Sequence, residues 1–191
     1  MTVLLPTTTI AHGTSLLHVS RLAYAGSALY FGCAGNRYDD PAGQYGVLYA
    51  ALDLSTALME SAFHGHRWYR APHLMTQHEL RERLVRDLAV FDPLTVLDLN
   101  APGVMAAQLG LNLNQLTSRD YRHTQRIGKL AYAQAGIDGI LYPSRNNYPG
   151  LCLALFDRCA SKLGLVADIA LDRHLHWPHF QRQYGIRVTP A

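Results

Sequence analysis

Three residues that could handle a nucleotide lie in one stretch of the sequence, GNRYDDPAGQYGVLYAALDLSTALMESAF, from Gly35 to Phe63. Arg37 offers a planar guanidinium that can pair with two phosphate oxygens at once. Tyr49 offers an aromatic face for a base, and Glu60 offers a carboxylate for sugar hydroxyls or for a cation formed at a sugar carbon. Each residue taken singly is more often structural, so it is their combination that indicates a dinucleotide site.

The stretch divides into a loop, a strand and a helix. Arg37 lies on the loop, because turn-forming residues surround it: Gly35, Asp39, Asp40, Pro41 and Gly43. Tyr45–Leu52 is apolar on both faces, which is typical of a strand covered on both sides. Asp53 or Ser55 can cap the helix that follows. Glu60 lies off the apolar stripe of that helix, which consists of Leu54, Ala57, Leu58 and Ala62.

The rest of the chain reads as short strands with a few helices. Strands are predicted at 15–24, within 90–99, and at 139–142, 151–156 and 163–171. Helices are predicted at 102–109 and 118–135, a helical turn or strand start at 77–84, and loops at 25–43, 64–75 and 112–116. The aromatic tail after Asp157 is expected to pack on the body. Because short strands outnumber helices, we expect a mixed, mainly antiparallel α+β domain.

Composition narrows the function classes. The 191 residues fit one domain, and 49% apolar against 16% charged residues supports a folded core. The net charge of +3 is mild and scattered, so no polyanion-binding surface is indicated. An odd set of cysteines without CxxC spacing predicts reduced thiols in a cytoplasmic protein: Cys33, Cys152 and Cys159. The histidines form no matched metal set, and neither a signal peptide nor a membrane span is expected.

Two segments resemble the RES domain, which is named for Arg, Glu and Ser and is the toxin of RES–Xre toxin–antitoxin pairs. The first, GNRYDDPAGQYGVLYAALDLSTALMES, is similar to the family's loop, strand ending in Tyr, and helix of the form S-x-A-x-x-E. The second, IGKLAYAQAGIDGILYPSRNNYPGLCLALF, is similar to its helix, strand ending in P-S, and following strand. On this resemblance Arg37, Glu60 and Ser144 are the naming residues, and Tyr49 matches the site tyrosine.

The resemblance implies a fold similar to ADP-ribosyltransferase toxins. This is a single compact α+β domain with a split or curved, mainly antiparallel sheet and flanking helices. The RES domain would span residues 15–158, after a lead-in at 1–14, and a C-terminal extension at 159–191 would pack on the same domain. Two departures from the family pattern stand out. The loop reads Asn-Arg-Tyr where many members have Gly-Arg-Trp, and His18 stands where an early arginine is expected.

The resemblance also implies an enzyme with NAD as substrate and without a cofactor. Cleavage of the nicotinamide–ribose bond by water or phosphate would make it an NAD glycohydrolase or phosphorylase that depletes a cell of NAD. Arg37 would grip the pyrophosphate, Tyr49 would stack on nicotinamide or shape its pocket, and Glu60 would hold the ribose hydroxyls and stabilise an oxocarbenium-like state. Ser144 would bind the ribose or orient the carboxylate. Three residues are assigned secondary roles: Arg21 at the pyrophosphate, Arg145 at an attacking phosphate, and Tyr38 as an aromatic wall.

Two alternatives stay open at this point. The first is a protein mono-ADP-ribosyltransferase toxin. The second is a nucleic-acid-binding or RNA-cleaving toxin, suggested by the modest positive charge and the aromatic-basic segment HRWYRAPH. If the chain is an NAD-degrading toxin, the resemblance implies an Xre-like antitoxin protein that covers the pocket. A toxin dimer within that complex is compatible with this hypothesis. Direct binding to nucleic acid or to a membrane is not expected.

Overall fold

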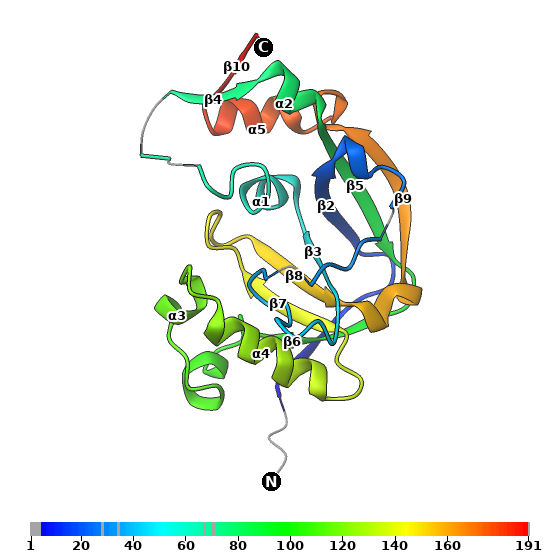
Figure 1. The fold of residues 1–191 in the computed structure, drawn as a ribbon, viewed down its shortest axis with the longest axis vertical. Helices are drawn as coiled ribbons and strands as arrows, with labels where there is room; N and C mark the ends of the chain where they lie inside the picture. The colour runs from blue at the N-terminus through cyan, green and yellow to red at the C-terminus, as the bar shows by residue number, and fades with distance from the viewer. Residues whose placement is uncertain (1–4, 28, 34, 67, 70–71, 191) are drawn as a thin grey trace.

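A curved sheet of eight strands organises the fold (Figure 1). The computed structural model describes residues 5–27, 29–33, 35–66, 68–69 and 72–190. The strands of the large sheet are β1 (Thr7–Ile10), β2 (Ser15–Arg21), β3 (Val47–Ala51), β5 (Arg83–Val90), β6 (Leu94–Asp98), β7 (Gly139–Pro143), β8 (Leu151–Phe156) and β9 (Leu163–Ala170). Two further strands form a small parallel sheet: β4 (His73–Thr76) and β10 (Ile186–Thr189).

The large sheet is mixed but mostly antiparallel. Its strand order is β1-β6-β7-β8-β3-β2-β5-β9, and within the described residues only the β6–β7 pair runs parallel. The helices are short, namely α1 (Leu54–Met59), α2 (Gln77–Arg81), α3 (Leu113–Thr117), α4 (Arg122–Ala133) and α5 (Trp177–Gln183). Short 3₁₀ helices lie at Leu22–Tyr24, Asp157–Lys162 and Leu171–Arg173, and a π-helical turn lies at Val104–Gln108. In the described part of the chain, the helices all fall short of the length and apolar character that crossing a membrane requires.

The central strand β3 is covered on both faces, as its sequence predicts. Val47 and Ala51 join the core that lies against the helices, whereas Leu48 and Ala50 join a second core inside the curl of the sheet. Successive side chains of a strand point to opposite faces, so an apolar residue at every position fits a strand buried on both sides. The position of Tyr49 follows from this alternation, because its side chain shares the helix-facing side with Val47 and Ala51.

The architecture confirms the expected single α+β domain with a curled, mainly antiparallel sheet. The strands predicted at 139–142, 151–156 and 163–171 are β7, β8 and β9. Two local predictions were wrong. Residues 112–116 were expected to be a loop, but Asn112 and Gln115 form a capping box that starts α3. The loop expected at 64–75 gives way to β4, which pairs with β10 from more than a hundred residues later.

The C-terminal segment is part of the folded body. Trp177 and Phe180 of α5 are 4% and 1% exposed and belong to the helix-side core. Gly185 then turns the chain with a φ of 62°, a left-handed conformation that glycine adopts without strain, and leads it into β10. In Figure 1, α2, α5, β4 and β10 gather at one end of the molecule, α3 and α4 lie toward the other, and α1 lies between them.

Gly128 is expected to be indispensable for the packing of α4. A Cβ at this position would lie 2.4 Å from the Tyr38 carbonyl oxygen and 2.7 Å from the Tyr45 hydroxyl. Helix propensity alone favours Ala over Gly by about 1 kcal/mol. Overpacking against backbone reverses the sign, so Gly128→Ala should lower the free energy of unfolding by ~1–3 kcal/mol in urea titrations. Gly65→Ala is the control, since among the described residues no atom beyond its chain neighbours lies within 4 Å of the added carbon. A Gly128→Ala protein as stable as wild type would contradict this packing.

Candidate active site

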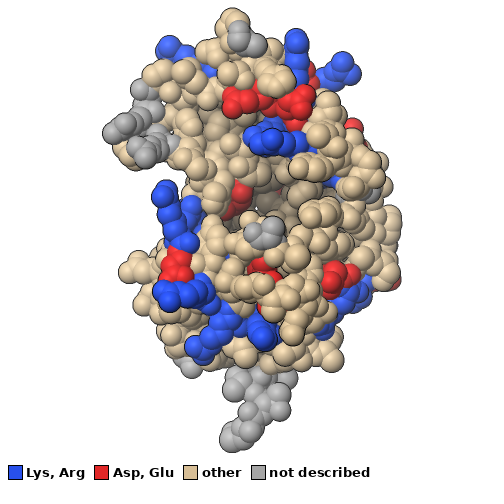
Figure 2. Space-filling model, in the orientation of Figure 1, with Lys and Arg blue, Asp and Glu red and all other residues tan. Residues whose placement is uncertain are grey.

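A cavity of ≈ 200 Å³ opens on the face that carries α1. Several separate elements contribute to its polar and aromatic lining, which includes His18 of β2, Arg37 of the loop before β3, Tyr49 of β3 and Glu60 at the end of α1. Figure 2 shows this face hollowed between its two ends, with acidic atoms on the wall of the hollow. Ligand pockets commonly measure about 300–1,000 Å³, so the enclosed volume suits part of a dinucleotide.

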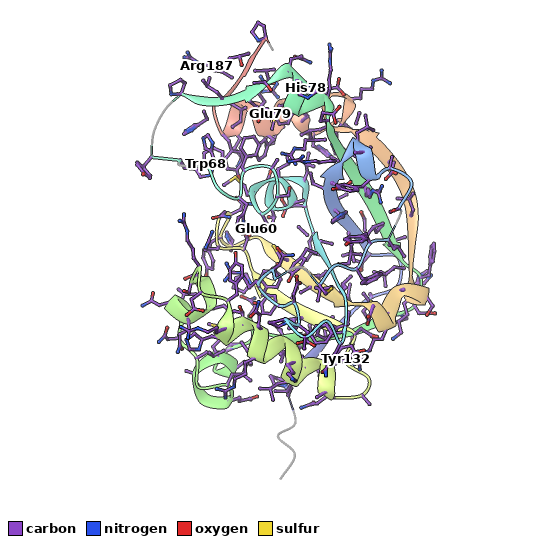
Figure 3. All side chains as sticks on the ribbon, in the orientation of Figure 1. Glu60, Trp68, His78, Glu79, Tyr132 and Arg187 are labelled. Carbon is purple, nitrogen blue, oxygen red and sulfur yellow. The ribbon has the colours of Figure 1, made fainter. Side chains whose placement is uncertain are left out.

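Glu60 is the carboxylate of the cavity. Helix α1 begins at its cap Asp53, whose side chain accepts from the Thr56 backbone N–H, and ends after Met59 with Glu60 as its C-cap. The Glu60 side chain is 16% exposed. Figure 3 shows it between α1 and the connection from β7 to β8. The short helix therefore delivers the carboxylate to the cavity at its very end.

The connection from β7 to β8 holds one oxygen of this carboxylate. The Ser144 hydroxyl donates to Glu60 Oε1 at 2.6 Å, and the Asn146 backbone N–H donates to the same oxygen at 3.0 Å. The other oxygen, Oε2, lies 3.6 Å from Nδ1 of His64. Oε1 therefore accepts two hydrogen bonds, whereas Oε2 has only the longer contact with His64 and is the oxygen more available to a ligand.

Glu60 is ionised at neutral pH. Burial alone would raise the pKa of its carboxyl. The polar contacts with His64, Ser144 and Asn146 outweigh burial and lower the pKa to about 2. The cavity therefore contains a negative charge that is fixed in position and partly shielded from water.

Arg37 places a positive charge in the same cavity. Its side chain is buried, and its Nη1 donates to the carbonyl oxygens of Leu116 and, at 3.3 Å, of Ser118. These carbonyls lie at the end of α3, where a helix leaves its last acceptors free. The guanidinium also lies over the Tyr121 ring, 5.0 Å from its centroid. Its Nη2 is buried without a hydrogen-bond partner among the described residues, which is the state expected of a donor reserved for an anion.

Tyr49 clamps the loop that carries Arg37. Its hydroxyl donates to Asp39 Oδ1 at 2.8 Å and accepts from the Tyr38 backbone N–H at 2.9 Å. Burial first, and the Asp39 carboxylate second, raise the pKa of this hydroxyl. Its polar end is therefore fully used within the protein, and the ring is the part left to line the cavity.

His18 occupies the position where an arginine was expected. Its Nδ1 lies 2.7 Å from the Tyr49 carbonyl oxygen, which can only accept, so Nδ1 carries the proton. Burial is the main cause that lowers the pKa of this imidazole. A neutral ring with Nε2 as an acceptor results. The secondary role expected for Arg21 at the pyrophosphate is not supported by its position, because Arg21 is exposed at the end of β2 and does not line the cavity.

Two further expected residues also lie outside the lining. Tyr38 is fully buried and packs its ring against Tyr142, 4.8 Å away between centroids, so it supports the wall beneath the surface. Tyr142 and Tyr121 line the cavity instead. Arg145 is half-buried, and its Nη1 donates to the Thr117 carbonyl oxygen at 3.2 Å, within the segment that also holds Arg37.

Sequence reasoning missed His64, Tyr121 and Asn146 as site residues, and it noted His18 only as a departure from the family pattern. His64 had a usable signal, because it stands four positions after Glu60, although the helix ends between them. The backbone N–H of Asn146 could not be found from residue type at all. Within the described residues, no three His, Cys, Asp or Glu side chains come together as ligands for a metal ion.

The ionised state of Glu60 predicts a loss of stability in acid. Because folding depresses the pKa of Glu60 from its ordinary 4.5 to about 2, the ionised form stabilises the fold above about pH 5. That contribution disappears as the pH falls through 4.5 toward 2. At about 1.4 kcal/mol per pKa unit, it amounts to at most ~3 kcal/mol. Urea titrations at pH 6 and pH 3 should show a smaller acid loss for Glu60→Gln than for wild type. Equal losses would mean that the carboxylate is not held as described.

Comparisons with known proteins show the family and the fold of the chain. A sequence model of the RES domain matches residues 15–178. A search of curated proteins gives no match. Among solved structures, a chain in the crystal structure of the M. tuberculosis MbcT–MbcA toxin–antitoxin complex is similar, with a TM-score of 0.67 and 19% identity. That match covers 91% of this chain and 90% of the other, and it shows a shared fold.

Proposed function

Because the chain belongs to the RES domain family, we propose that it is an enzyme that cleaves the nicotinamide–ribose bond of NAD and acts as the toxin of a toxin–antitoxin pair. The observation that carries this proposal is the pair formed by Glu60 and Ser144. An ionised carboxylate, fixed by a hydroxyl and a backbone N–H, lines one cavity with Arg37. The buried Nη2 of this guanidinium has no hydrogen-bond partner among the described residues.

The reaction needs little acid–base catalysis. The bond between C1 of the ribose and the pyridinium nitrogen breaks, and its electron pair leaves with nicotinamide as a neutral base. A positive charge develops on the ribose, and Glu60 Oε2 is placed to stabilise it while binding a ribose hydroxyl. A single carboxylate therefore suffices, because the leaving group needs no proton.

The attacking group would be water or phosphate. Water would give ADP-ribose and a proton, and phosphate would give ADP-ribose carrying a phosphate at the ribose carbon. Arg37 Nη2 would bind the pyrophosphate of NAD, and the Tyr49 ring would flank the nicotinamide. Arg145 would reach an attacking phosphate only after leaving the Thr117 carbonyl. A cavity of ≈ 200 Å³ would enclose the nicotinamide riboside half and leave the adenosine half nearer the surface.

A partner that silences the toxin is part of the proposal. The similar structure is a toxin–antitoxin complex, and we expect an Xre-like antitoxin to cover the cavity of this chain. Expression of the chain in a bacterial host should stop growth and lower intracellular NAD, and Glu60→Gln should do neither. Growth arrest with an unchanged NAD level would argue against NAD as the target.

Transfer to protein is the second outcome to test. The same cavity could present the ribose cation to a protein side chain, which would make the chain a mono-ADP-ribosyltransferase. NAD labelled in its adenosine half, incubated with the chain and a cell lysate, distinguishes the two. We expect the label in free ADP-ribose or its phosphate. Label retained on a lysate protein would favour transfer.

A further inference from the structure

The C-terminal segment reaches the active site through a chain of hydrogen bonds. The Tyr184 hydroxyl, just after α5, donates to Asn147 Oδ1 at 2.6 Å. The Asn147 amide in turn donates from Nδ2 to Thr56 Oγ1 at 2.9 Å, and the Thr56 hydroxyl donates to Asp53 Oδ2 at 2.7 Å. All donors point the same way, and the chain ends on a carboxylate, where a hydrogen bond is strongest.

This series of hydrogen bonds connects the two segments that position Glu60, namely α1 and the β7–β8 connection. Asp53 is the N-cap of α1, the helix whose C-cap is Glu60. Asn147 belongs to the β7–β8 connection, and its backbone N–H donates to Ser144 Oγ at 2.9 Å. That hydroxyl then donates to the carboxylate. Tyr184 is thus linked to the carboxylate by way of Asn147 and Ser144, and to its helix by way of Thr56.

The two segments approach each other closely at this point. A Cβ at Gly150 would lie 2.1 Å from Thr56 Oγ1, so the β7–β8 connection lies directly against α1. Asn147 has its carbonyl, its amide and its backbone N–H all engaged, which leaves it a single position. Without the Tyr184 hydroxyl, Asn147 Oδ1 would lose the partner that fixes this orientation.

The tail itself is firmly anchored. The Tyr184 ring packs on Phe180 and Trp68, with centroids 4.4 Å and 5.6 Å away. Strand β10 pairs with β4 directly after it. The tyrosine is therefore held independently of its hydroxyl, and the match to the RES sequence model ends before it, at residue 178.

We infer that Tyr184 is a positioning residue for the Glu60–Ser144 pair, supplied by a segment beyond the region that matches the family. It acts through Asn147, which sets the turn whose Ser144 hydroxyl and Asn146 N–H bind the carboxylate. The expected effect on turnover rests on the proposed function. The effect on the carboxylate does not.

The test is Tyr184→Phe, which keeps the ring and removes the hydroxyl. The kcat for nicotinamide release from NAD should fall roughly 10-fold, because the loss is that of one hydrogen bond and the placement it enforces. The KM for NAD should stay within about twofold, since Tyr184 does not line the cavity and the pyrophosphate contact at Arg37 is untouched. Tyr132→Phe is the matched control, because that ring stacks on Tyr45 away from the site.

A second readout does not depend on catalysis. The chain has only three glutamates, Glu60, Glu79 and Glu82, so their carboxyl carbons can be followed by ¹³C NMR in a pH titration. The midpoint of Glu60 should move upward by up to ~1 pH unit in Tyr184→Phe, because its donors are less well placed. It should not move in Tyr132→Phe. If wild type fails to consume NAD, the proposed function fails, and the Glu60 midpoint still decides the positioning role.

A double variant separates positioning from general weakening. If Tyr184 acts through Asn147, adding Tyr184→Phe to Asn147→Ala should lower kcat no further than Asn147→Ala alone. Multiplied losses would overturn the inference. So would a Tyr184→Phe protein with wild-type kcat and a wild-type Glu60 midpoint, or equal losses in Tyr184→Phe and Tyr132→Phe.

Discussion

With Glu60 replaced by Gln, the release of nicotinamide from NAD is expected to fall by ~10²–10³-fold or more while the protein stays folded. Gln keeps an oxygen that can accept from the Ser144 hydroxyl and the Asn146 N–H, so the geometry survives. What is lost is the negative charge, which matters most when the ribose becomes cationic. The loss should therefore appear in kcat rather than in the KM for NAD.

Glu79→Gln is the matched control for this experiment. Glu79 completes a capping box at the start of α2, and Gln can serve in the same box. Figure 3 shows Glu79 at the α2 end of the molecule, apart from Glu60. Circular dichroism should be alike for both variants near neutral pH, although Glu60→Gln should unfold at a lower temperature because it lacks the stabilising charge. Activity of Glu60→Gln close to that of wild type would remove this carboxylate from the mechanism.

Replacing Arg37 by Lys should raise the KM for NAD by ~10–100-fold with a smaller change in kcat. The charge is kept, but the planar fork is not. Arg37 donates from Nη1 to the carbonyls of Leu116 and Ser118, while Nη2 has no partner in the described part of the chain, so the guanidinium can hold the loop and an anion at the same time. A lysine ammonium group cannot bind the carbonyls and an anion in that geometry. The stacking of the guanidinium on Tyr121 is also lost.

The measurement is a steady-state titration of NAD, together with inhibition by ADP-ribose, which shares the pyrophosphate. Both the KM for NAD and the inhibition constant for ADP-ribose should rise in parallel. Arg122→Lys is the control, since Arg122 is exposed and paired with Asp120 outside the cavity. An unchanged KM with an intact fold would show that Arg37 is a structural residue of the loop.

The sequence is informative where local patterns carry the structure. Strand β3 could be recognised because its apolar residues fill both faces, and α1 could be placed because Asp53 is a strong cap. The pairing of β4 with β10 could not be found. Each strand is four residues long, and their contact joins segments more than a hundred residues apart. Helix α3 was missed although its capping box was visible at Asn112 and Gln115.

The candidate site divides in the same way. Glu60 and Ser144 are 84 positions apart, so their contact at 2.6 Å could be expected only through the family resemblance. Their catalytic roles remain predictions. The sequence marked His18 only as a departure from the family pattern, and it gave no sign of Tyr121 or Tyr184, because a tyrosine next to a helix is usually part of the core. They are recognised in the structure by the orientation of single atoms, which a residue pattern does not encode.

We propose that this chain breaks the nicotinamide–ribose bond of NAD. This proposal is tested most directly by incubating the purified chain with NAD, with and without phosphate, and identifying all products by chromatography and ³¹P NMR. We expect one nicotinamide for each NAD consumed, matched by ADP-ribose in water or by its ribose phosphate when phosphate is present, and neither from Glu60→Gln. NAD that stays intact with folded wild-type protein, or is cut at the pyrophosphate instead, would contradict it.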